Sequence, residues 1–173
     1  MLYGYAGKVL HVDLTSGSLT VEEPSEAFYR TYLGGSAVGV YYLLRNTPPG
    51  ADPLGPENTL TFAVSAMTGA PISGQARCSA VARSPLTGAY GESEAGGFWG
   101  PELKAAGYEA IIVTGRAPAP VYLWITGEGC EIRDAGRLWG RDPEFTQQAI
   151  REELGDRLVR VLQTGLGGEN LVR

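Results

Sequence analysis

The middle of the chain has the residue types of an anion-binding site. A glycine-rich stretch, Glu94 to Pro101, leads into a segment, 101–106, that is expected to be a short helix. Free backbone N–H groups in such a loop, with the positive end of a helix dipole, suit an anion such as phosphate. The alternative is that the glycines only permit a tight loop, which is common in proteins without ligands.

Arg77 is the cation that could join this loop. It lies in a predicted strand, 76–83, whose opposite face carries only small residues. A guanidinium donates several hydrogen bonds in a fixed fork, so it binds phosphate or a pterin ring well. Taken alone, the pattern favours the alternative that Arg77 is an exposed or ion-paired strand arginine.

Three other features of the sequence resemble binding sites but lack residues that such sites require. The segment 165–170 resembles part of a dinucleotide fingerprint, but Asn170 replaces the third glycine and little chain follows for a helix. Cys78 and Cys130 are too few for the four thiolates of an iron–sulfur cluster, and both are expected in the core. His11 is expected on a strand surface, without the partners of a zinc site.

Composition indicates one globular domain over residues 1–173. Hydrophobic residues make up 43% of the chain and charged residues 19%, which is enough for a sizeable core. The net charge of −5 argues against nucleic acid or an anionic membrane as the main partner. There is no apolar run long enough for a bilayer and no visible secretory signal, so the cytoplasm is the expected location.

The order hairpin, helix, strand occurs twice along the chain. The first half is predicted as a hairpin over 8–22, helices capped by Ser25 and Ser36, and a strand at 60–64; the second as a hairpin over 121–133, a helix from Asp142 and a strand at 158–162. Between the halves lies the glycine-rich centre, with 90–100 expected as a loop. We predict an α+β fold in which two similar halves form a mainly antiparallel sheet saddle around this centre.

Several segments resemble the N-terminal domain of the aldehyde ferredoxin oxidoreductases. They are 4–14, 84–88, 96–111 and 167–172, in the family's order, and 84–115 is the most specific. The resemblance implies an enzyme that oxidises aldehydes to carboxylic acids and passes electrons to ferredoxin. It implies tungsten, or molybdenum, held between two pterins, a magnesium ion bridging the pterin phosphates, and a [4Fe–4S] cluster nearby.

The resemblance also assigns roles to residues of the glycine-rich centre. Arg77 matches the cofactor-contacting arginine, and Gly96, with Gly97 beside it, matches a backbone contact to the cofactor. Glu94 matches a residue whose backbone carbonyl helps hold the magnesium, although the family often has asparagine there. A carboxylate beside phosphates is unfavourable unless it points away or meets the cation, so only the carbonyl role carries over readily.

Three hypotheses follow. In the family, the cluster cysteines, the acid/base residues and a second phosphate-contacting segment lie beyond the equivalent of Arg173. The first hypothesis is therefore a cofactor domain, inactive alone, whose partners are the remaining domains, ferredoxin and an aldehyde that the sequence does not specify; a homodimer is left open. The second is a non-catalytic pterin- or phosphate-binding assembly module. The third is a scaffolding domain without ligand affinity.

Overall fold

The computed structural model describes residues 4–172, and its centre is a six-stranded sheet with the order β2-β1-β6-β3-β4-β5. Only β1 and β6 pair in parallel, and all other neighbours are antiparallel. The α+β class and the mainly antiparallel sheet are thereby confirmed. The strands of this sheet are β1 (Lys8–Asp13), β2 (Ser18–Glu22), β3 (Leu60–Ala63), β4 (Cys78–Arg83), β5 (Tyr90–Ala95) and β6 (Tyr108–Thr114).

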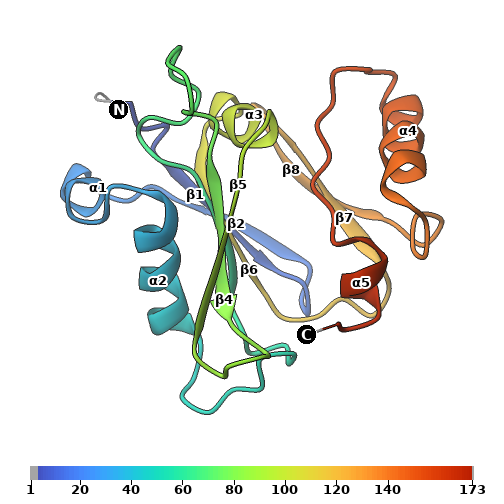
Figure 1. Ribbon diagram of the computed structural model, residues 1–173, viewed down its shortest axis with the longest axis horizontal. Helices are drawn as coiled ribbons and strands as arrows, with labels where there is room; N and C mark the ends of the chain where they lie inside the picture. Colours follow the sequence, from blue (N-terminus) through green and yellow to red (C-terminus); the bar gives the residue numbers. More distant parts are fainter. Residues whose placement is uncertain (1–3, 173) are drawn as a thin grey trace.

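Both faces of the sheet are covered (Figure 1). Two helices, α1 (Glu26–Tyr32) and α2 (Gly35–Asn46), lie against one face, where Val38 and Tyr42 are buried. The other face carries α3 (Trp99–Ala105) and the separate hairpin of β7 (Val121–Thr126) and β8 (Gly129–Asp134). Beyond this hairpin lie α4 (Pro143–Leu154) and α5 (Gly165–Glu169). None of the helices described is long and apolar enough to cross a membrane.

Local capping and turn signals behave as predicted. The Ser25 hydroxyl accepts a hydrogen bond from the Phe28 N–H at 3.4 Å, and the Asp142 carboxylate accepts one from the Phe145 N–H at 2.9 Å. These bonds satisfy N–H groups that have no partner inside the helix. Gly17 turns the first hairpin with φ of +72°, a conformation that glycine adopts without strain. These interactions span only a few residues, so sequence alone predicts them.

The predicted cap at Ser36 is wrong. The helix begins at Gly35, two residues earlier than a cap at Ser36 implies, and Gly34 occupies the cap position with φ of +110°. A Cβ on Gly34 would lie only 2.6 Å from the Val64 carbonyl oxygen, so the chain can pass close to β3 only with glycine there. The Ser36 hydroxyl instead contacts Ser79 and Glu92 of the sheet.

Two predictions about strands are also wrong. The segment expected as a loop over 90–100 contains β5, an edge strand whose polar composition hides it from a search for apolar alternation. The strand expected at 158–162 does not form; Val159 and Val161 pack beside the cluster of α4 without a neighbouring strand. The second half therefore contributes a hairpin outside the main sheet instead of repeating the first half.

The isolated histidine and the cysteines are mostly placed as expected. Cys78 is buried and Cys130 is half-buried against the same core cluster. His11, expected on the surface, is half-buried, and its Nε2 lies 2.8 Å from Glu22 Oε2. The Tyr42 hydroxyl donates to the same carboxylate oxygen at 2.9 Å, so this group links β1, β2 and α2.

Candidate anion-binding site

The β4–β5 pairing brings Arg77 and the glycine loop together. Cys78 pairs with Ala95, so Arg77 and Gly96 face each other just beyond the paired residues. A Cβ built on Gly96 would lie 3.7 Å from Arg77 Nη1, which places the guanidinium directly against this glycine. The two features that the sequence singled out are therefore neighbours in space, at the open end of a hairpin.

The glycine loop presents its backbone to solvent. Gly96 and Gly97 are both exposed, and Gly97 has φ of +105° with no atom within 4 Å of a built Cβ. Glycine is required there by the backbone conformation, not by crowding. The helix that follows, α3, has only seven residues, so its dipole is weak and the site depends mainly on Arg77 and the loop backbone.

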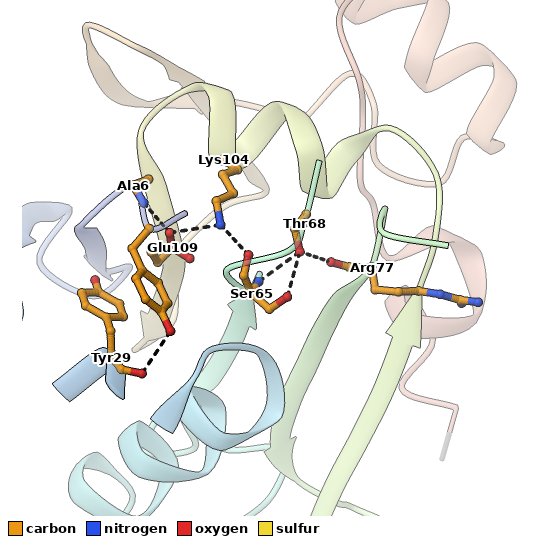
Figure 2. A network of polar contacts seen from close by, with 8 residues as sticks. Ala6, Tyr29, Ser65, Thr68, Arg77, Lys104 and Glu109 are labelled. Atoms are coloured by element: carbon orange, nitrogen blue, oxygen red, sulfur yellow. Dashed lines mark hydrogen bonds and ion pairs between the residues drawn. The ribbon is translucent and has the colours of Figure 1, made fainter. Parts of the chain in front are cut away.

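The Arg77 guanidinium is free to meet a ligand. Its side chain is exposed, and no carboxylate of residues 4–172 forms an ion pair with it. Figure 2 shows the side chain pointing away from the buried polar contacts behind it, whereas the Arg77 carbonyl faces Thr68. An exposed, unpaired guanidinium beside bare backbone can receive an oxyanion through its fork of N–H donors.

Glu94 lies in β5, opposite Ser79 of β4. Alternate residues of a strand share one face, so its exposed side chain lies on the α2 side, together with Glu92. Within the described part of the chain, no group of three or more His, Cys, Asp or Glu residues could hold a metal ion.

Arg160 is a cation near the loop that sequence reasoning missed. Its guanidinium carbon lies 4.3 Å from the ring centroid of Phe98, which directly follows Gly97. This cation–π contact joins the loop to the segment between α4 and α5, which returns along the side of α4 (Figure 1). The Nε atom of Arg160 is buried and has no hydrogen-bond partner. No local pattern in the sequence relates two residues so far apart.

A buried ion pair lies behind the site (Figure 2). Lys104 Nζ lies 3.4 Å from Glu109 Oε1 and also donates to the Ser65 carbonyl, while the Ala6 N–H donates to the same Glu109 oxygen. Burial raises the pKa of Glu109, and Ala6 and Lys104 oppose this only in part. Burial likewise lowers the pKa of Lys104, against the attraction of Glu109. The pair fixes the start of β6 to α3 and to the loop after β3.

The sheet, the arginine and the exposed glycine loop together define an α+β domain with a candidate anion-binding site. The model of the family "aldehyde ferredoxin oxidoreductase, N-terminal domain" matches residues 9–173. The chain belongs to this family.

Several relatives are similar in sequence to almost the whole chain. The tungsten-containing aldehyde ferredoxin oxidoreductases of Pyrococcus abyssi and Pyrococcus furiosus are 43% and 41% identical over 99% of this chain. A Pyrococcus furiosus protein described as an aliphatic sulfonate oxidoreductase, WOR-like subunit, is 34% identical. The chain spans 28% of the length of the first two relatives. Among solved structures, the active site complex BamBC of benzoyl coenzyme A reductase, with 1,5-dienoyl-CoA, matches with a TM-score of 0.87 and 40% identity, over 91% of this chain and 24% of that one.

Proposed function

We propose that this chain is the domain of a tungsten-dependent oxidoreductase that holds the phosphate-bearing part of the tungsten–pterin cofactor. The observation that carries the proposal is the Arg77 guanidinium lying against Gly96, whose absent side chain leaves room for a ligand beside the arginine. The cofactor, when bound, supplies the metal-centred redox chemistry, and the protein supplies placement and electrostatics.

The residues present suit such a group. Arg77 donates hydrogen bonds to a phosphate or to the pterin, and Gly96 and Gly97 let the ligand approach the backbone without a side chain in the way. Glu94 contributes its backbone carbonyl to a magnesium ion. Magnesium requires an octahedral set of oxygens and commonly takes them from phosphates and water, so one protein oxygen is enough for this role.

The larger enzyme, we propose, oxidises an aldehyde to a carboxylic acid and passes the electrons to ferredoxin. The support is that four relatives, 40–43% identical over 99% of this chain, carry the aldehyde ferredoxin oxidoreductase name. The [4Fe–4S] cluster belongs to the remaining domains, because the two cysteines here are too few to bind it. This domain's contribution is to hold the cofactor in place.

The test is the tungsten and pterin content of the full-length enzyme carrying Arg77→Ala. We expect most of the cofactor to be lost, because residues 94–101 contain no arginine or lysine and the nearby Arg160 guanidinium lies over the Phe98 ring. Arg77→Lys should retain an intermediate amount, because lysine keeps the charge but not the fork. Arg116→Ala is the matched control, since Arg116 is also exposed and lies outside the site. Wild-type tungsten content in the Arg77→Ala enzyme would overturn the proposal.

A further inference from the structure

We infer that Thr68 is a positioning residue for this site, because it holds Arg77 and the helix after the glycine loop in a fixed relation. Thr68 lies in the loop between β3 and β4 and is almost completely buried, at 5% exposure. Because its side chain is buried, its effect passes through Arg77 and through the helix that follows the glycine loop. The inference rests on the proposed role of Arg77 and deepens it.

The hydroxyl of Thr68 fixes the backbone of Arg77. Its Oγ1 donates a hydrogen bond to the Arg77 carbonyl at 2.9 Å and accepts one from the Ser65 N–H at 3.0 Å (Figure 2). Arg77 lies just before β4, outside the ladder of strand hydrogen bonds. A bond from Thr68 to its carbonyl sets the orientation of the peptide plane, and therefore the direction in which the Arg77 side chain leaves the chain.

The methyl group of Thr68 lies close to α3, the helix that follows the glycine loop. Gly100, in the first turn of α3, is buried, and a Cβ there would lie 3.5 Å from Thr68 Cγ2 and 3.3 Å from the Arg77 carbonyl oxygen. Thr68 therefore lies between the residue that carries the guanidinium and the helix into which Gly96 and Gly97 lead. One side chain contacts both parts of the proposed site.

The loop that carries Thr68 is itself anchored. The Thr68 N–H donates to the Ser65 carbonyl at 3.0 Å, and the Gly69 N–H donates to the Gln75 carbonyl at 2.7 Å, which closes the loop at both ends. The Ser65 carbonyl also accepts from Lys104, whose ammonium is paired with buried Glu109. Thr68 is consequently held by α3 and β6 and can transmit that rigidity to Arg77.

The test uses the chain with inorganic phosphate as the probe, followed through the amide NMR signals of Gly96 and Gly97. Thr68→Val keeps the shape of the side chain but removes the hydroxyl. Thr61→Val is the matched control, because Thr61 is buried in β3 and its hydroxyl has no partner. Thr68→Ser should rescue the hydrogen bond. Thermal unfolding of each variant identifies a temperature at which all are folded.

We expect Thr68→Val to weaken phosphate binding about three- to tenfold, the effect of losing one buried hydrogen bond partner. Thr61→Val and Thr68→Ser should bind like the wild type, within about twofold. A purely structural role would lower stability without changing the affinity of the folded protein. If Thr68→Val does not fold, Thr68→Ser and Thr68→Ala make the comparison, since they differ only in the hydroxyl.

The outcomes distinguish failure of the Thr68 positioning role from failure of the proposed function. Wild-type phosphate affinity in folded Thr68→Val, together with loss of binding in Arg77→Ala, overturns the positioning role and leaves the proposed function intact. Absence of any phosphate-dependent change at Gly96 and Gly97 in the wild type, with Arg77→Ala behaving identically, overturns the proposed function and this inference with it.

Discussion

Replacing Lys104 by methionine should destabilise the domain strongly at neutral pH and much less in acid. The Lys104 ammonium is the only cation paired with Glu109 among the ion pairs of residues 4–172, and the Glu109 side chain is 1% exposed. Methionine fills a similar volume, so the change removes the charge with little effect on packing. Glu109 would then keep only the hydrogen bond from the Ala6 N–H.

The expected loss of stability in Lys104→Met follows from leaving the Glu109 carboxylate buried without its cation. Breaking a buried ion pair on one side costs about 3–5 kcal/mol, a large part of the roughly 5–15 kcal/mol by which a domain is stable. The bond from Lys104 to the Ser65 carbonyl adds about 1 kcal/mol. A double variant with Glu109→Gln removes both charges and keeps an acceptor for Ala6, so it should recover most of the loss.

The pH dependence has a definite sign. Burial already raises the pKa of Glu109 in the folded protein, and loss of Lys104 removes one of the interactions that oppose this rise. An acid whose pKa is raised by folding favours the folded state below its unfolded pKa, and this contribution disappears as the pH rises through the folded value. The difference between Lys104→Met and wild type should therefore be small near pH 4 and largest above pH 7.

Urea unfolding of the wild type, both single variants and the double variant, at acid and at slightly alkaline pH, measures each of these quantities. The four proteins form a cycle that isolates the coupling between the two side chains. A loss below about 1 kcal/mol for Lys104→Met, or a loss that is the same at both pH values, would refute the buried ion pair.

Two further predictions concern contacts that hold the sheet and the loop. Gly39→Ala should destabilise the domain by about 1–3 kcal/mol in urea unfolding, because the added Cβ would lie 2.5 Å from Val81 Cγ2. Val81→Ala in the same chain should relieve the clash. A Gly39→Ala single variant as stable as the wild type would contradict this packing. Arg160→Ala should lower the free energy of unfolding by about 0.5–2 kcal/mol, because it removes the contact with Phe98. The same substitution at exposed Arg157 should leave the stability unchanged. Equal effects of the two substitutions would argue against the Arg160–Phe98 contact.

The candidate site was predicted in part from the sequence. Arg77 and the glycine loop were recognised because guanidinium and bare backbone both suit oxyanions, whatever the fold. Their closeness was hypothesised from the sequence, but the pairing that produces it was not predicted, since β4 pairs with a segment that was expected to be a loop. Thr68 and Arg160 gave no signal, because each acts through a contact that no local sequence pattern marks.

Sequence by itself determined the features that depend on neighbouring residues. Ser25 and Asp142 cap helices through bonds to N–H groups three residues away, and Gly17 turns a hairpin because its backbone allows positive φ. Family membership was also recognised from the sequence, since motifs in a fixed order carry it, and the family match confirms it.

Only the tertiary structure decided which extended segments become strands and which charges are buried. Tyr90–Ala95 is polar but forms β5, because β4 supplies hydrogen bonds along its whole length, whereas the apolar segment 158–162 has no neighbouring strand to pair with. Glu109 is the second residue of the otherwise largely apolar strand β6, and its charge is buried where Lys104 of α3 meets it. Strand pairing and charge pairing both require a partner in another element, and the fold alone determines which partner is near.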